Sequence, residues 1–240
     1  MMKPMNSIAT EKSASSPALA AASSVFLVDD DASVRRALAR LIKSAGHSVQ
    51  TFASAREFLG TQAGGEKAAC LVLDVRMPGI TGIDLQRELQ TLNRDVPIVF
   101  ITGHGDIPMS VKAMKAGAVD FLPKPVKDTD LLRAIDQALA RAWRDRAARK
   151  ELADIESCAE KLTAREHEVM ALVASGMPNK RIAFELGTVE KTIKVHRARI
   201  MQKMQVQSLA DLVRAAEKLR LLPKPRATEP ASAPVIGDRV

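Results

Sequence analysis

Polar residues that could carry out chemistry follow four short apolar runs of this sequence. The residues at the ends of these runs are Asp29 and Asp30, Asp74, Thr102 and Lys124. Carboxylates held close together repel each other, and a hard divalent cation such as Mg²⁺ relieves that repulsion by taking oxygen ligands. A lysine nearby supplies a point charge that suits a phosphoryl oxygen. The set therefore predicts a phosphoryl-transfer site, with Asp30 and Asp74 as metal ligands and Asp74 as the nucleophile.

These residues can meet only if the intervening elements bring the ends of the apolar runs to one place. Short apolar runs bounded by turn residues are typical of buried strands, and here they alternate with segments of helical periodicity. The expected strands cover residues 25–28, 47–52, a run ending at 74, 96–101 and 118–122. The expected helices cover residues 34–45, 54–59, 82–92, 106–117 and 128–143. Five alternations predict a parallel sheet with helices on both faces, whose strands all end along one edge.

Each of these residues also has an interpretation that involves no chemistry. Asp74 could simply end a strand, Thr102 could cap a turn, and Lys124 could be a solvated surface charge. Phe121, which stands three residues before Lys124, could be an ordinary core residue. The order and spacing of the whole set favour a common site over several independent coincidences.

Composition is typical of a globular protein with one or two domains. Of the 240 residues 46% are hydrophobic, and because only 3% are aromatic the expected cores are aliphatic. Cys70 and Cys158 have no metal-ligand spacing, which favours a reducing compartment. No run approaches the roughly 18 apolar residues of a membrane span, and Glu11 and Lys12 interrupt the apolar centre that a signal peptide needs. We therefore expect a cytoplasmic protein without membrane contact, whose residues 1–24 form a disordered tail.

Charge is distributed unevenly along the chain. Residues 25–140 hold 14 Lys and Arg against 14 Asp and Glu, whereas residues 160–220 hold 12 against 7. A neutral first part and a basic second part indicate that only the second part meets a polyanion. Residues 223–240, rich in Pro and Ala, are expected to form a second disordered tail.

A helical linker is expected between the two parts. Residues 128–143 have an amphipathic helical pattern, and a similar pattern resumes at Leu152, out of phase by one residue. Residues 144–150 carry no apolar stripe. This arrangement predicts a mostly helical linker over residues 141–158 with a solvated middle, and a continuous coiled coil is the alternative.

Residues 159–222 have the pattern of four short helices. Thr163 and Glu166 form a Thr-x-x-Glu capping box, Asn179 can cap the second helix, and Ser208 can cap the fourth. The third helix, residues 190–204, is apolar on one face and basic on the other. Its inner residues are Ile193, Ile200 and Met204, and its outer residues are Lys191, Lys194, Val195 and Ala198.

This third helix favours a helix-turn-helix arrangement. Its lysines could contact phosphates or guanine edges, and its small apolar side chains could meet a thymine methyl group. The alternative is a solvated charged face with no partner.

Residues 25–140 resemble the receiver domain of two-component response regulators, which is an α/β domain with a five-stranded, doubly wound, flavodoxin-like sheet. The stretches that carry the resemblance are Val28-Asp29-Asp30-Asp31, Leu73-Asp74-Val75-Arg76-Met77-Pro78-Gly79, Ile101-Thr102-Gly103 and Asp120-Phe121-Leu122-Pro123-Lys124-Pro125. The resemblance implies that Asp74 receives a phosphoryl group from a sensor histidine kinase. It also implies Mg²⁺ held by Asp29 or Asp30, by Asp74, and by the main-chain carbonyl of Arg76.

The resemblance to receiver domains further implies a switch. Thr102 would move to hydrogen-bond the phosphoryl group, Phe121 would turn inward behind it, and Lys124 would contact a phosphoryl oxygen. Many members have Tyr at the position of Phe121, and Phe lacks the hydroxyl that could exchange partners. The Lys124–Pro125 peptide bond is expected to be cis.

Residues 160–220 resemble the four-helix LuxR-type DNA-binding domain. The matching stretches are Leu162-Thr163-Ala164-Arg165-Glu166, Asn179-Lys180-Arg181-Ile182-Ala183 and Thr192-Ile193-Lys194-Val195-His196-Arg197. The implied base contacts come from Lys194 and Val195, the implied phosphate contacts from Lys180, Lys191 and Thr192, and the wider interface includes Ala198 and Arg199. The family usually has a capping Ser where Val189 stands. Val cannot cap, so either Thr188 substitutes or the first turn frays.

Together the two domains resemble response regulators of the FixJ/NarL class. The resemblance implies a transcription regulator, not an enzyme beyond its own phosphorylation, that binds double-stranded DNA. Phosphorylation would favour a homodimer through the face formed by Ala118–Leu139, placing two recognition helices about one DNA turn apart, with RNA polymerase as a further partner. The alternatives are a Mg²⁺-dependent phosphohydrolase and a DNA-binding protein whose first domain only docks other proteins.

Overall fold

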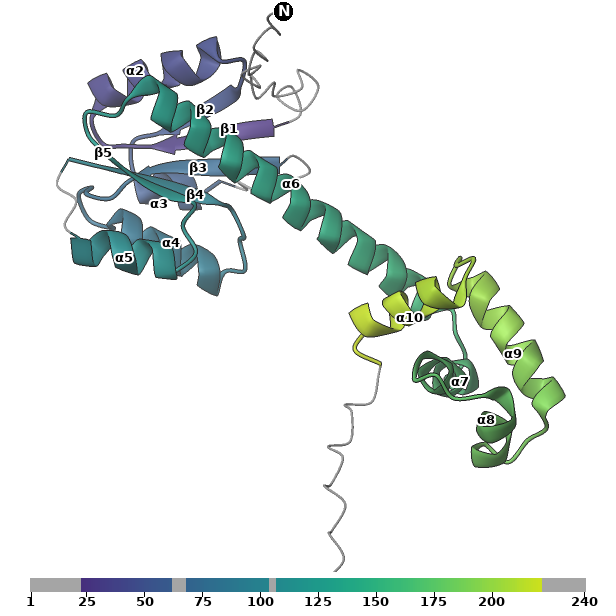
Figure 1. The fold of residues 1–240 in the computed structure, drawn as a ribbon. Helices are drawn as coiled ribbons and strands as arrows, with labels where there is room; N and C mark the ends of the chain where they lie inside the picture. The colour runs from purple at the N-terminus through teal and green to yellow at the C-terminus, as the bar shows by residue number, and fades with distance from the viewer. Residues whose placement is uncertain (1–22, 62–67, 104–106, 222–240) are drawn as a thin grey trace, which may run out of the picture. The chain divides into compact units, whose positions relative to one another are not determined.

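The computed structural model describes residues 23–61, 68–103 and 107–221. It divides into two compact units, with the division between Ala147 and Ala148 (Figure 1). Of the predicted tails, residues 1–22 and 223–240 lie outside the described residues, as does Asp106 at the start of an expected helix. Among the described residues, the helices are all too short or too polar to cross a bilayer.

The first unit is built on a five-stranded parallel sheet with strand order β2-β1-β3-β4-β5. The strands are β1 (Ser23–Val28), β2 (Ser48–Phe52), β3 (Ala68–Asp74), β4 (Ile98–Thr102) and β5 (Asp120–Pro123). The helices are α2 (Ala32–Ser44), α3 (Ala55–Leu59), α4 (Gly82–Thr91), α5 (Ile107–Lys115) and α6 (Asp128–Ala159). This is the predicted flavodoxin-like order, in which β1 and β3 flank the point where the strand order reverses.

Both faces of the sheet are covered, as predicted. Figure 1 shows α2 and α6 on one face and α3, α4 and α5 on the other. Strand β3 lies between two other strands and all seven of its residues are buried, so its sequence is apolar without alternation until Asp74. Leu71 and Leu73 pack into one core, and Cys70 and Val72 pack into the other.

Strand boundaries differ from the predicted ones by one or two residues. β1 begins at Ser23, two residues inside the segment expected to be a tail, because Ser23 and Ser24 pair in register with Ala68 and Ala69 of β3. β4 begins at Ile98, because Pro97 has no N–H to offer a neighbouring strand.

Helix α6 is a single helix that runs without interruption through the predicted linker. No Gly or Pro occurs within it, so nothing in the sequence breaks the helical hydrogen bonds. Its early residues Leu131 and Ile135 pack into the core of the first unit, and Ala159 packs into the core of the second. Residues 144–150 are mostly exposed, as the absence of an apolar stripe predicts.

The second unit packs four helices against the end of α6. They are α7 (Ala164–Ala174), α8 (Asn179–Glu185), α9 (Glu190–Lys203) and α10 (Leu209–Lys218). The core includes the predicted inner residues Ile193 and Ile200 of α9 and Met204, which is the C-cap of that helix. The Thr163–Glu166 capping box is formed at α7, and Ser208 caps α10 together with Asp211.

The predicted cap at Asn179 is wrong. Asn179 is the first residue of α8, and Pro178 occupies the N-cap position without a side-chain hydrogen bond. The Asn179 side chain instead accepts a hydrogen bond of 2.9 Å from the guanidinium of Arg197 on α9. A partner on another helix therefore took precedence over local capping.

Candidate functional site

The carboxyl edge of the sheet brings Asp29, Asp74 and Lys124 into contact. Asp29 follows β1, Asp74 ends β3, and Lys124 follows β5. The Lys124 amine donates hydrogen bonds of 2.8 Å to Asp29 Oδ2 and 2.6 Å to Asp74 Oδ2. Both carboxylates are buried, whereas Lys124 is partly exposed. The charged amine of Lys124 therefore bridges the two carboxylates, at the edge where ligands bind in sheets of this topology.

Main-chain groups orient the other oxygens of the two carboxylates. Asp29 Oδ1 accepts from the Asp31 amide at 2.8 Å, and Asp74 Oδ1 accepts from the Arg76 amide at 3.1 Å. Asp31 is itself fixed, because its side chain caps helix α2. These contacts leave each acid with one oxygen held by backbone and one directed toward the centre of the site.

The charges of the site are mutually dependent. Burial raises the pKa of Asp29 above its ordinary value of 3.8, and the charge of Asp74 adds to that shift while Lys124 opposes it. Burial alone would lower the pKa of Lys124, but its hydrogen bonds and ion pairs with Asp29 and Asp74 outweigh burial and raise it above 10.5. Lys124 is therefore a permanent cation at neutral pH.

The acidic residues also fit a metal ion. One carboxylate oxygen from each of Asp29, Asp30 and Asp74 lies within 4.8 Å of the others. Asp30 is exposed, so the group opens to solvent on that side. Oxygen donors and an open side are what Mg²⁺ requires, because it dehydrates reluctantly and keeps several waters. The Arg76 backbone is adjacent, since its amide contacts Asp74.

Gly82 supports Asp74 in a way that periodicity could not reveal. A Cβ atom at Gly82 would lie 2.4 Å from the carbonyl oxygen of Asp74, and its amide donates to Val75 at 2.9 Å. The start of α4 therefore packs directly on the backbone of the central acid, and only glycine fits there. Its position shortly after the Asp74 strand and at the start of an expected helix was the signal available in the sequence.

Thr102 lies on β4, the strand next to that of Asp74, and Phe121 lies on β5, one strand further out. Thr102 is buried at the end of β4, and its carbonyl accepts from the Lys124 amide at 2.7 Å. The half-buried ring of Phe121 on β5 packs against Phe100, with 6.1 Å between ring centroids. The Lys124–Pro125 peptide bond is cis, as predicted.

The second unit presents a basic surface on α8 and α9. The exposed residues of the predicted DNA interface are Lys180, Lys191, Lys194, Val195, Ala198 and Arg199, and Thr192 is half-buried. The Arg197–Asn179 hydrogen bond joins the two helices beneath this surface. Val189 is the N-cap of α9 and forms no side-chain capping bond. A helix with one basic exposed face, supported by a second short helix, is the helix-turn-helix arrangement.

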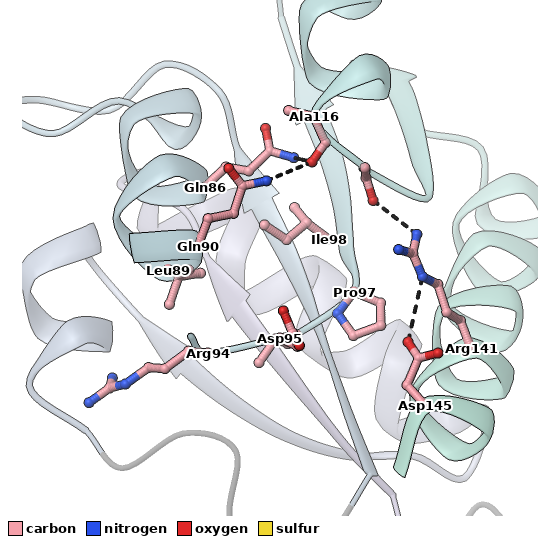
Figure 2. Close-up of a pocket in the computed structure, with 12 residues that line it drawn as sticks. Gln86, Leu89, Gln90, Arg94, Asp95, Pro97, Ile98, Ala116, Arg141 and Asp145 are labelled. Atoms are coloured by element: carbon pink, nitrogen blue, oxygen red, sulfur yellow. Dashed lines mark hydrogen bonds and ion pairs between the residues drawn. The ribbon is translucent and has the colours of Figure 1, made fainter. Parts of the chain in front are cut away.

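A separate cavity of about 350 Å³ lies at the opposite edge of the sheet, where β4 begins (Figure 2). Its polar side chains are used within the protein: Gln86 and Gln90 donate to the Ala116 carbonyl, and Arg141 donates to Gly117 and pairs with Asp145. Figure 2 shows these contacts joining three parts of the chain. The cavity is therefore a structural junction between α4, the turn before β5, and α6.

Fold and sites together define a signal-receiving domain joined to a DNA-binding domain. Residues 25–136 match the response regulator receiver domain, and residues 160–216 match the bacterial regulatory proteins of the luxR family. The chain belongs to the two-component response regulators that combine these domains and regulate transcription.

Relatives of similar length support this assignment. Nodulation protein W of Bradyrhizobium diazoefficiens is 51% identical over 81% of this chain and 86% of its own. Transcriptional regulatory protein FixJ of Rhizobium meliloti is 42% identical over 80% of this chain and 94% of its own. The structure of response regulator StyR, 52% identical, superposes with a TM-score of 0.72 and covers 82% of this chain and 98% of its own. Full-length FixJ from B. japonicum, 40% identical, gives a TM-score of 0.50 and covers 83% and 98%.

Proposed function

We propose that Asp74 is the phosphoacceptor of this response regulator. The observation that carries the proposal is the Lys124 amine, which bridges Asp74 and Asp29 at the reversal point of the sheet. A carboxylate oxygen of Asp74 attacks the phosphorus of a phosphohistidine on the sensor kinase. The bond from phosphorus to histidine nitrogen breaks as the bond to the Asp74 oxygen forms.

The neighbours of Asp74 have separate roles in this step. Asp29, Asp30, Asp74 and the Arg76 carbonyl would hold Mg²⁺, which would supply positive charge to the phosphoryl oxygens when bound. Lys124 stabilises the product because its amine then donates to a phosphoryl oxygen the hydrogen bond that it donates here to the Asp74 carboxylate. Backbone contacts from Asp31 and Arg76 keep the acids in place throughout.

Phosphorylation then changes the surface next to Thr102 and Phe121. Thr102 moves toward the phosphoryl group and Phe121 turns further inward, which favours a conformation that dimerises through the Ala118–Leu139 face. Helix α5 contacts β5 beside this face, and its exposed apolar side chains Val111 and Met114 would extend the apolar surface of the dimer.

The dimer presents two recognition helices to adjacent half-sites of double-stranded DNA. Lys194 and Val195 contact base edges, Lys180, Lys191 and Thr192 contact phosphates, and Ala198 and Arg199 extend the interface. The protein works in the cytoplasm, where the kinase, the DNA and RNA polymerase are all available to it. It catalyses no reaction other than its own phosphorylation and dephosphorylation.

A gel-shift titration of the full chain at fixed salt tests this function, with and without acetyl phosphate as phosphoryl donor. We expect the donor to tighten binding to a promoter fragment and to shift the protein from monomer to dimer. Asp74→Asn, which keeps the size of the side chain but cannot form an aspartyl phosphate, should show neither change. Identical binding and oligomeric state with and without the donor would refute the switch.

A further inference from the structure

Helix α9 contains one acidic side chain among its basic ones. Glu190 is the acid, and it precedes five cationic residues of the same helix: Lys191, Lys194, Arg197, Arg199 and Lys203. Glu190 is exposed on the same side of the helix as Lys194, because residues four apart share a face. A carboxylate on a surface that contacts DNA repels the phosphates, so Glu190 must contribute something that offsets this repulsion.

Stabilisation of the helix gives only part of that reason. Glu190 stands in the first turn of α9, where a negative charge complements the helix dipole and Val189 provides no cap. The side chain, however, is directed to a specific partner: Glu190 Oε1 lies 3.2 Å from the amine of Lys194. Interaction with the dipole alone does not require that partner.

The pair presents a hydrogen-bond donor and an acceptor side by side. In a G·C base pair the major groove also presents an acceptor and a donor side by side, guanine O6 and cytosine N4. These two atoms are hydrogen-bonded to each other at about 2.9–3.0 Å, close to the 3.2 Å between Glu190 and Lys194. Lysine donates to guanine O6 or N7, and glutamate accepts from cytosine N4.

We propose that Glu190 is a specificity-determining residue, and that Glu190 and Lys194 together read a single G·C base pair. This inference rests on the proposed function of α9 as the recognition helix. In the free protein the carboxylate holds the Lys194 amine and keeps it from binding phosphates non-specifically. At a G·C base pair each group gains a base partner. C·G and A·T present the two partners in the opposite order, and T·A presents a methyl group where guanine N7 would accept from Lys194.

Selection from a pool of randomised DNA duplexes tests the proposal with the full chain and acetyl phosphate. We expect the wild-type protein to select G·C at one position of the half-site. Glu190→Gln and Lys194→Ala should each relax the preference at that same position, by about tenfold in relative affinity, and leave the other positions unchanged.

Glu185→Gln is the matched control. Glu185 on α8 is also exposed and also pairs with a cation four residues away, Arg181, at 3.6 Å, so the substitution makes the same change in net charge. We expect it to leave every base preference intact. Circular dichroism of each variant verifies that the overall helix content is unchanged.

The outcomes separate this inference from the function on which it rests. If the two α9 variants relax different positions, or if Glu190→Gln keeps the wild-type preferences, the shared base pair is refuted while sequence-specific binding stands. If the phosphorylated wild-type protein selects no sequence at all, the proposed function fails and this inference fails with it.

Discussion

At the scale of single residues, the buried acids of this protein are held by hydrogen bonds from lysines that are distant in the sequence. Asp29 and Asp74 share the amine of Lys124, and Glu166 of α7 accepts from Lys203 of α9 at 2.6 Å. Glu166 also accepts from the Thr163 amide at 2.8 Å, within its capping box. Its side chain is almost completely enclosed. Two different tasks, joining helices and capping one of them, therefore depend on a single carboxylate.

Glu166 should make the second unit sensitive to acid. The hydrogen bond from Lys203 and the capping bond lower the pKa of Glu166 to about 2, from an ordinary value of 4.5. A lowered pKa in the folded state stabilises the protein above the unfolded pKa, and this stabilisation is lost as the pH falls from about 4.5 through about 2. Glu166→Gln should reduce the free energy of unfolding at pH 7 by about 1–3 kcal/mol and flatten its dependence on pH in that window.

Calorimetry of the full chain between pH 2 and 7 measures this effect, with hydrogen exchange assigning the transition to α7 and α9. Glu168→Gln is the control, because Glu168 pairs with Arg165 on the exposed side of the same helix. If Glu166→Gln retains the wild-type dependence on pH, Glu166 is not the group responsible.

Gly82 is the residue whose size matters most to the position of Asp74. Gly82→Ala would bring a Cβ atom against the Asp74 carbonyl, where backbone must move to make room. We expect a loss of about 1–3 kcal/mol in stability and slower phosphorylation of Asp74. Gly60→Ala should change neither, because a Cβ at Gly60 meets its nearest atoms at 3.5 Å. Rates of phosphorylation by acetyl phosphate, followed by mass spectrometry, distinguish the two variants, and equal rates would contradict the role of Gly82.

At the scale of elements, local signals and tertiary contacts compete at helix ends. Thr163 and Ser208 cap their helices as their sequences predict. Asn179 does not cap its helix, because its side chain accepts a hydrogen bond from Arg197 of α9. α9 itself begins without a side-chain cap at Val189, so the recognition helix depends on packing of Ile193 and Ile200 more than on its own termini.

Val189→Ser should therefore stabilise the second unit. A serine hydroxyl at the N-cap accepts from an amide of the first turn, which typically contributes about 0.5–2 kcal/mol. The amide hydrogens of residues 191–192 should exchange more slowly, as measured by hydrogen exchange of the full chain. Val189→Ala has no hydroxyl and should give no such protection. Equal protection in the two variants would show that another group already satisfies those amides.

At the scale of the whole molecule, the charge division of the sequence corresponds to the two units. The neutral part forms the α/β receiver domain, and the part with excess Lys and Arg forms the helical DNA-binding domain. α6 joins them as a continuous helix with an exposed middle. A continuous helix therefore connects the two domains covalently.

The proposed dimerisation through the Ala118–Leu139 face predicts the effect of a charge placed beside it on α5, the helix that contacts β5. Met114→Glu should abolish dimer formation in the presence of acetyl phosphate, because each protomer would bring an unpaired carboxylate into an apolar interface. Leu92→Glu is the control, since Leu92 is an exposed apolar residue of similar accessibility at the end of α4. Light scattering of the full chain measures both, and a Met114→Glu dimer as stable as wild type would exclude this face.

The sequence by itself determined the order of elements, the strand ends that carry Asp29, Asp74, Thr102 and Lys124, and the helix caps at Thr163 and Ser208. These features depend on periodicity and on residues a few positions apart, which the chain encodes locally. Only the tertiary structure decided that Lys124 bridges Asp29 and Asp74, 95 and 50 residues away. It likewise decided that Gly82 contacts Asp74 and that Asn179 binds Arg197. Contacts of this kind depend on which strands and helices become neighbours. The arrangement of neighbours is set when both faces of the sheet and the apolar face of each helix are buried together.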